Sequence, residues 1–160
     1  MGRVLLEDTR QQKGKHRRKH AWWERLGIRL LRTKLPFGDY CLPPLVAVDT
    51  KASIQELAYD IDCDHARFRR ELTGARDAGT QLVVLVENDD GVGSVEELAG
   101  WSESPEDFAK RRSAQRRLKG ERLAKACVTM EERYGPRFEF CTPDESAERV
   151  WEILEDGGRR

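Results

Sequence analysis

Two aspartates and a lysine are the residues of this chain whose types and spacing could carry chemistry. Asp39 follows a glycine, and Asp49 and Lys51 end a short apolar run, LVAV, that is typical of a buried β-strand. Because successive strand side chains alternate between faces, Asp49 and Lys51 point to the same side. Pro43 and Pro44 bend the chain between this strand and the preceding DYCL segment. A hairpin of this kind can bring Asp39 beside Asp49.

Two carboxylates and an amine at one sheet edge are the groups needed for metal-dependent hydrolysis of a phosphodiester. Carboxylate oxygens bind hard divalent cations such as Mg²⁺ or Mn²⁺. The Lys51 ammonium can orient the attacking water or stabilise the negative charge that develops in the transition state. We therefore expect Asp39 and Asp49 to be metal ligands and Lys51 to be the electrostatic catalyst.

The stretch from Gly38 to Lys51, GDYCLPPLVAVDTK, resembles the nuclease motif of the XPF-type structure-specific endonucleases. These belong to a restriction-endonuclease-like group with the signature Asp…(Asp/Glu)-x-Lys. The resemblance implies an α/β fold with a mixed central sheet flanked by helices, and metal-dependent cleavage of DNA, including branched or structured DNA. The family usually has Glu-Arg-Lys where this chain has Asp49-Thr50-Lys51. The arginine is absent here, so the family's substrate preference is not carried over.

A second part of the resemblance lies near the N-terminus. A short apolar strand is expected over residues 3–6, and it runs into Asp8-Thr9-Arg10. The family commonly opens with a strand that ends in Asp-x-Arg-Glu, which implies that Asp8 completes or orients the metal shell and that Arg10 contacts the substrate. Gln11 stands in place of the glutamate, so either activity is weaker or another group substitutes. The alternative for Asp8 is an ordinary strand-end or helix-capping aspartate.

Basic residues gather in two segments, although the formal net charge of the 160-residue chain is zero. The first segment runs from Arg10 to Lys34 and includes a helix expected over residues 13–26, and the second runs from Lys110 to Lys125. Such segregation fits a face for a polyanion, and DNA is the expected partner. In the first segment the candidate phosphate contacts are Lys15, Arg17, Arg18 and Lys19. For the second segment a solvated helix face is an equally good interpretation.

The same first helix carries two aromatic residues and two histidines. Trp22 and Trp23 could stack on bases, but we expect at least one of them to anchor the helix to the sheet. His16 and His20 have the i, i+4 spacing of zinc ligands. No third ligand is evident, so a zinc site is not expected.

Further candidates lie on the elements after Lys51. Ser53 and Glu56 form a capping box, so Glu56 is either a helix cap or a displaced acid of the site. Ala66-Arg67-Phe68 resembles a Gly-Arg-Phe-like sequence on a family helix, and Arg67 is a candidate phosphate contact or else an exposed helix arginine. The run QLVVLVE predicts a central strand buried on both faces, with Glu87 at its end as a weaker candidate.

The rest of the chain keeps a strand–helix rhythm without further motifs. The pattern predicts a loop over residues 88–104 with a short helix, a helical stretch over 105–134 with a break at Gly120, a strand over 137–141 and a final helix. We expect residues 1–156 to form one nuclease domain, with the resemblance strongest over 3–90, and 157–160 to be a disordered tail. No tandem helix-hairpin-helix region follows, which fits a free-standing domain of the type met in phage and prophage genomes.

The cysteine pattern and the absence of long apolar runs indicate a cytoplasmic protein. The four cysteines are widely spaced and contain no CxxC pair, as in a reduced chain. No apolar run could span a bilayer, and the N-terminus lacks a signal-peptide core. Pairing with a second copy to form a homodimer is left open. The main alternative function is a non-catalytic nucleic-acid-binding module on the same fold, and metal binding would discriminate between the two.

Overall fold

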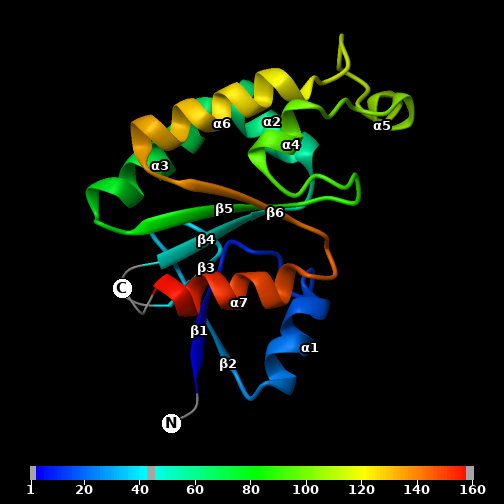
Figure 1. Cartoon of the computed structure of the whole chain (residues 1–160). Coiled ribbons are helices and arrows are strands. Elements are labelled where there is room, and N and C mark those ends of the chain that lie inside the picture. Colours follow the sequence, from blue (N-terminus) through cyan, green and yellow to red (C-terminus); the bar gives the residue numbers. More distant parts are fainter. Residues whose placement is uncertain (1–2, 43–45, 158–160) are drawn as a thin grey trace.

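The computed structural model describes residues 3–42 and 46–157, which form one mixed six-stranded sheet between two layers of helices (Figure 1). The strand order in the sheet is β2-β1-β3-β4-β5-β6. The strands are β1 (Val4–Asp8), β2 (Arg29–Thr33), β3 (Tyr40–Leu42), β4 (Val46–Lys51), β5 (Gln81–Glu87) and β6 (Arg137–Cys141). The helices are α1 (Arg17–Arg25), α2 (Ile54–Asp62), α3 (His65–Asp77), α4 (Val95–Ala99), α5 (Pro105–Lys110), α6 (Gly120–Tyr134) and α7 (Ser146–Gly157). The architecture is the α/β fold that the sequence predicts.

The direction of the strands decides which residues meet at an edge of the sheet. Strands β4, β5 and β6 are parallel, whereas β3 is antiparallel to both of its neighbours, β1 and β4. The carboxyl ends of β1, β4 and β5 therefore lie at the same edge as the beginning of β3. This edge collects Asp8, Asp39, Lys51 and Glu87.

The two faces of the sheet carry separate hydrophobic cores. Helices α2, α3, α4 and α6 supply side chains to the core that contains Val84 and Val86 of β5. Helices α1 and α7 supply side chains to the core that contains Val83 and Leu85. The run over 81–87 is therefore buried on both faces, as its continuous apolar sequence predicts.

Trp23 fixes α1 to the sheet. Its side chain is 1% exposed, its Nε1 donates a hydrogen bond to the Ala147 carbonyl oxygen at 3.0 Å, and its ring meets the Tyr40 ring edge-on. The expectation that one of the paired tryptophans anchors the helix is confirmed.

Some predicted boundaries are wrong. Helix α1 begins at Arg17 rather than near Lys13, and the helical stretch predicted over 105–134 is divided by an irregular segment over 111–119. Gly157, assigned to a disordered tail, is the last residue of α7. Residues 158–160 and the two prolines at 43 and 44 lie outside the described residues.

The four cysteines are all free thiols. Within residues 3–42 and 46–157, no helix is long and apolar enough to cross a membrane.

Candidate active site

Gly38 presents Asp39 to β4. Gly38 has φ 74°, and a Cβ at this position would lie 3.1 Å from both the Ala47 Cβ and the Val48 carbonyl oxygen, so glycine is required for both its conformation and its space. The Asp39 amide donates to the Val48 carbonyl oxygen at 2.7 Å. Because Tyr40 pairs with Val48, the next position of the ladder sets Asp39 opposite Asp49. The hairpin predicted between the two aspartates is present.

The Asp39 carboxylate is buried and held from two sides. One oxygen, Oδ2, accepts hydrogen bonds from the Thr50 amide and the Thr50 hydroxyl, both at 2.7 Å. The other oxygen, Oδ1, accepts one from the Gln11 side-chain amide. Burial raises the pKa of Asp39 and outweighs the opposing effect of these donors and of Lys51.

Lys51 lies between two aspartates on the α2 and α3 side of the sheet. Its Nζ is 2.7 Å from Asp49 Oδ2 and 2.5 Å from Asp60 Oδ2. Its ammonium also lies 5.1 Å from the centre of the Phe68 ring. Burial works to lower the pKa of Lys51, but the carboxylates of Asp49 and Asp60 outweigh burial and raise the pKa. The lysine is therefore charged at neutral pH.

Negative charge exceeds positive charge in this group. Burial raises the pKa of Asp49 to about 7, with a further contribution from Asp39 and against the effect of Lys51. Burial and the neighbouring Asp49 also raise the pKa of Glu71, whose Oε1 accepts a hydrogen bond from the Gly38 amide at 2.8 Å. The carboxylates thus lack sufficient counter-charge.

Two buried oxygens of the group accept no hydrogen bond from any described residue: Asp49 Oδ2 and Asp60 Oδ2. The Lys51 ammonium is an ion-pair partner of both oxygens, at 2.7 Å from that of Asp49 and 2.5 Å from that of Asp60. Hard carboxylate oxygens with unfilled acceptor capacity fit a divalent cation. Within the described residues no three acidic, histidine or cysteine side chains form a ready-made metal site. Asp49 therefore has an oxygen suited to a cation, and Asp39, which lies opposite it in the hairpin, is the nearest candidate for a second ligand.

Asp8 lies at the same edge of the sheet, but its carboxylate makes hydrogen bonds with Arg10 and Leu35. Oδ1 accepts hydrogen bonds from the Arg10 amide at 2.6 Å and from Arg10 Nε at 2.9 Å, and Oδ2 accepts from the Leu35 amide at 3.0 Å. Burial works to raise the pKa of Asp8, but the bonds with Arg10 and Leu35 lower it overall. The link to the site is through the backbone, since the Asp8 amide donates to the Asp39 carbonyl oxygen at 2.7 Å.

Gln11 connects the site to α1. While its amide nitrogen donates to Asp39, its Oε1 lies 2.6 Å from Nε2 of His16, which must then be the protonated ring nitrogen. The residue in the place of the family's glutamate is thus a direct neighbour of a predicted metal ligand. His20 binds Glu7 instead, at 2.7 Å, so the two histidines have different side-chain partners.

Arg67 reaches the site from α3. It lies 3.0 Å from Asp60 Oδ1, also pairs with Asp64, and keeps 52% of its side chain exposed. Asp60 and Glu71 were missed by sequence reasoning because neither belongs to a motif. The signal for Glu71 is its position on the side of Arg67 and Phe68 of α3. Asp60 lies on α2, and its contact with Lys51 exists only once the helix is packed on the sheet.

Three other candidates have roles away from the site. Glu87 faces the α1 and α7 side, where it pairs with Lys19 and accepts a hydrogen bond from the Ser146 hydroxyl at 2.6 Å. The prediction of Lys19 as a phosphate contact is wrong, because the residue is 6% exposed and bound to Glu87. Glu56 is a helix cap: it accepts from the Ala52 amide at 2.7 Å.

The remaining basic candidates of α1 and the preceding turn are exposed. Lys15 and Arg17 face solvent, and Arg18 pairs on the surface with Asp144. They are accessible to a polyanion, in contrast to Lys19.

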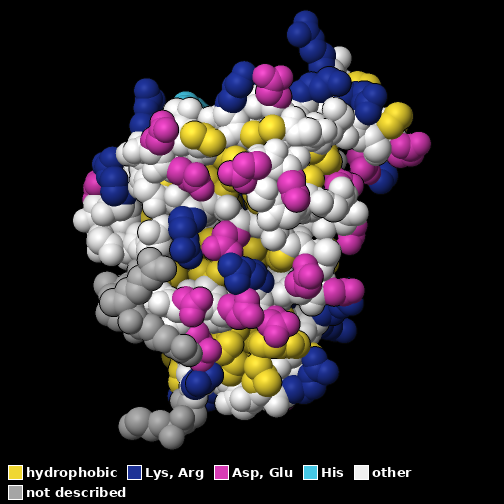
Figure 2. All heavy atoms as spheres, in the orientation of Figure 1, with side chains coloured by type: hydrophobic (Ala, Val, Ile, Leu, Met, Phe, Trp, Pro, Cys, Tyr) yellow, Lys and Arg dark blue, Asp and Glu magenta, His cyan; other side chains and the backbone are white. Residues whose placement is uncertain are grey.

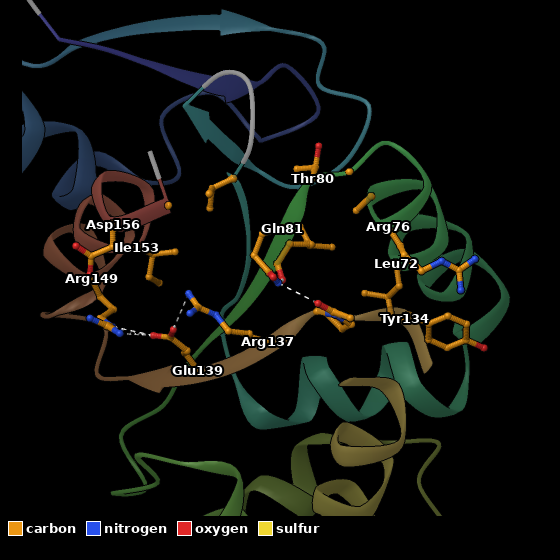
Figure 3. A pocket seen from close by; sticks show the side chains of 17 residues that line it. Leu72, Arg76, Thr80, Gln81, Tyr134, Arg137, Glu139, Arg149, Ile153 and Asp156 are labelled. Atoms are coloured by element: carbon orange, nitrogen blue, oxygen red, sulfur yellow. Dashed lines mark hydrogen bonds and ion pairs between the residues drawn. The ribbon is translucent and has the colours of Figure 1, made fainter. Parts of the chain in front are cut away.

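A cavity lies away from this site (Figure 3). It has a volume of about 500 Å³ and lies at the amino ends of β4, β5 and β6, beside Gln81, Tyr134 and Arg137. Glu139 within it pairs with both Arg137 and Arg149. The aspartates and Lys51 lie at the other ends of these strands, so we assign no catalytic part to the cavity.

No family model and no curated protein sequence matches the chain. Among solved structures it is similar to XPF from Aeropyrum pernix, with a TM-score of 0.67 and 19% identity over 98% of this chain and 66% of the other. A structure of the same protein in complex with DNA gives a TM-score of 0.66, 16% identity and the same coverage. The chain has the XPF-type nuclease fold.

This similarity concerns the fold alone. The chain spans 66% of the length of the XPF chain that it matches. The XPF-type fold agrees with the resemblance found in the Gly38–Lys51 motif, while the geometry of the acidic group comes from this chain's own residues.

Proposed function

We propose that this chain is a divalent-metal-dependent DNA endonuclease that hydrolyses phosphodiester bonds, including those of branched or structured DNA. The observation that carries this proposal is the buried group of Asp39, Asp49 and Lys51, in which carboxylates outnumber their cations. The similarity to XPF, which has been solved with DNA, supports DNA as the substrate.

The side chains that would hold the cation, Mg²⁺ or Mn²⁺, are Asp39 and Asp49. When bound, such a cation neutralises charge on the phosphate and lowers the pKa of a coordinated water. Thr50 and Gln11 fix the orientation of the Asp39 carboxylate. We give Asp8 an orienting part, since its bonds to Arg10 and to the Asp39 backbone hold the edge of the sheet in place.

In the reaction water adds to phosphorus, one P–O ester bond breaks, and the leaving oxygen gains a proton. Lys51 is positioned to stabilise the negative charge that develops on the phosphoryl oxygens. Asp60 and the Phe68 ring hold its ammonium in place. The proposed phosphate contacts around the site are the exposed or half-exposed basic residues Arg10, Lys15, Arg18 and Arg67.

A nicking assay on branched and linear DNA tests the proposal. We expect strand cleavage with Mg²⁺ or Mn²⁺, none with EDTA, and a loss on the order of 10²–10³ in rate for Asp49→Asn, which removes a negative ligand. Isothermal titration with Mn²⁺ should show weaker binding to the same variant.

A non-catalytic nucleic-acid-binding module is the second candidate, because Gln11 stands where the family has glutamate. It predicts DNA binding without cleavage and no Mn²⁺ binding that depends on Asp49. Cleavage by Asp49→Asn at the parent rate would refute the nuclease assignment. Cytoplasmic location and a homodimeric state stay predictions from the sequence.

A further inference from the structure

The segment over residues 111–119 is a strongly basic loop between α5 and α6. It extends from the body of the protein at the upper right of Figure 1, where dark blue side chains gather in Figure 2. Its basic residues are Arg111, Arg112, Arg116, Arg117 and Lys119. We call this segment the basic arm.

Glu103 binds both ends of the basic arm. Its side chain is fully buried, and it accepts hydrogen bonds from Arg111 Nε at 2.7 Å, from a terminal Arg111 nitrogen at 2.5 Å and from the Leu118 amide at 3.0 Å. Its carbonyl oxygen accepts from Arg117 Nε at 2.7 Å, and its amide donates to the Leu118 carbonyl oxygen at 3.1 Å. A single glutamate thus closes the loop through its side chain and its backbone.

The base of the basic arm is also fixed by backbone contacts. Ser102 and Lys119 form an isolated antiparallel bridge, and the Gly120 amide donates to the Trp101 carbonyl oxygen at 2.8 Å. A Cβ at Gly120 would lie 1.8 Å from the Leu98 carbonyl oxygen, so only glycine allows this close approach. These contacts therefore fix the orientation of the basic arm relative to the body of the protein.

Three cations of the basic arm remain free. Arg111 and Arg117 are bound to Glu103, whereas Arg112, Arg116 and Lys119 are exposed and have no ion-pair partner in the described ranges 3–42 and 46–157. Burying a carboxylate and gathering like charges both cost free energy. A bound polyanion would relieve the repulsion between the three free cations.

The basic arm lies one helix away from the candidate active site. Asp60 of helix α2 contacts Lys51. Asp62, at the end of the same helix, pairs with Arg122, which follows the basic arm in the chain. Burial works to raise the pKa of Glu103, but hydrogen bonds from Arg111, from the Leu118 amide and from the Gln55 side chain of α2 lower it. Since a helix is about 10 Å wide, a DNA backbone can reach from the arm to the site.

We propose that the basic arm is a preorganised binding surface for DNA backbone phosphates, and that Glu103 is the residue that positions the arm. This inference rests on the proposed function, and it adds a contact surface on the far side of α2 from Lys51. Phosphate contacts of this kind set register and affinity without reading sequence.

The first test replaces the free cations together, as Arg112→Ala, Arg116→Ala and Lys119→Ala. Binding of a labelled duplex is followed by fluorescence anisotropy in EDTA across a salt series. We expect weaker binding and a salt slope shallower by about 2.7, roughly 0.9 for each phosphate that the variant no longer neutralises. The control removes the same charge from the exposed residues Arg69, Arg76 and Arg133 and should leave the slope near that of the parent. Equal slopes for the arm variant and the parent would overturn the proposal that the basic arm binds phosphates.

The second test separates positioning from charge. Glu103→Gln removes a negative charge, so electrostatics alone predicts equal or tighter DNA binding. The proposal predicts the opposite, weaker binding with a slope shallower by about 1 or more, because the arm loses its anchor. The control Glu121→Gln removes an exposed charge that pairs, among residues 3–42 and 46–157, with Lys125, and it should bind equally or more tightly.

Arg111→Lys provides a variant that keeps every charge. Lysine lacks the two-pronged geometry of the guanidinium, so the anchor to Glu103 weakens while the net charge stays the same. We expect the same direction of change as for Glu103→Gln. Parent-like DNA binding by both variants would show that Glu103 does not position the basic arm for binding.

The outcomes also separate this inference from the proposed function. If the parent binds DNA through the basic arm but never cuts it, the proposed nuclease function is overturned and phosphate binding by the arm stands. If the parent cuts DNA and the arm variants bind DNA like the parent, phosphate binding by the basic arm is overturned and the proposed nuclease function stands.

Discussion

Two largely buried groups of charged and polar residues lie on opposite faces of the sheet at the same edge. The first, here the site cluster, comprises Asp39, Asp49, Lys51, Asp60 and Glu71. The second, here the α1 cluster, comprises Glu7, Lys19, His20, Glu87 and Ser146. Both put ionisable groups out of water, which is costly unless they are paired.

The α1 cluster is balanced. Lys19 pairs with Glu87, which also accepts a hydrogen bond from the Ser146 hydroxyl. Glu7 has His20 at 2.7 Å and Arg32 at 3.3 Å. Each carboxylate thus has its own cation, and the whole group joins α1 to β1, β5 and α7.

The site cluster has too few cations. Its three aspartates and one glutamate share Lys51 and the half-exposed Arg67. This difference separates a group that stabilises the fold from one suited to bind a further cation. A balanced group has no electrostatic need for a ligand, whereas an acidic group is relieved by one.

The largest contrast is expected between the two buried lysines. Lys51→Ala should lower the cleavage rate on the order of 10²–10³ and leave Mn²⁺ affinity unchanged or slightly higher, because a positive charge next to the carboxylates is removed. Lys19→Ala should leave the rate unchanged but lower the free energy of unfolding by about 3–5 kcal/mol, since Glu87 loses its partner. Single-turnover cleavage and urea unfolding measure the two effects.

A Lys51→Ala variant that cuts DNA as fast as the parent would contradict the assignment of the site cluster. A Lys19→Ala variant that loses cleavage while its stability is unchanged would show that the α1 cluster takes part in the chemistry.

The pH dependence of stability should reveal the excess negative charge. The pKa of Asp49 is raised from 3.8 to about 7, so the folded protein binds this proton more tightly than the unfolded chain. The destabilising effect is absent below about pH 4 and complete above about pH 7, where it reaches up to about 4 kcal/mol at about 1.4 kcal/mol per pKa unit. In EDTA the parent should therefore unfold at lower urea concentration at pH 8 than at pH 5.

Asp49→Asn is the matched variant, because it keeps the shape of the side chain and cannot ionise. It should be more stable than the parent at pH 8 and lose the part of the difference that Asp49 contributes, while Asp39 and Glu71, whose pKa values are also raised, keep theirs. The same pH dependence in parent and variant would exclude Asp49 as the source.

A smaller effect is expected at the glutamine beside Asp39. Gln11→Ala removes a hydrogen bond to Asp39 and should weaken Mn²⁺ binding by about 10–100-fold, as for other groups that orient metal ligands. The exposed neighbour Gln12→Ala is the local control. Ser146→Ala removes a comparable donor from the α1 cluster and should leave Mn²⁺ affinity unchanged. Isothermal titration compares the three variants, and equal affinities would remove the orienting part of Gln11.

Local sequence determined much of the site cluster. Alternation along β4 placed Asp49 and Lys51 on one face, and Gly38 before Asp39 predicted the turn that only a residue without a side chain can make. The apolar run over 81–87 predicted a central strand, and the capping box of Ser53 and Glu56 predicted the start of α2. These features depend on neighbours within a few residues, so short-range sterics and periodicity are sufficient.

The tertiary structure alone decided which distant groups meet. Glu87 faces away from the site because β5 pairs with β4 in the register Lys51–Val86, which turns the next residue to the other side. Asp60 reaches Lys51, and Glu103 binds both ends of the basic arm, through packing between elements far apart in the chain. Spacing within one element fixes the relative direction of its own side chains. The face on which that element packs, and therefore the partner of each charge, depends on long-range contacts.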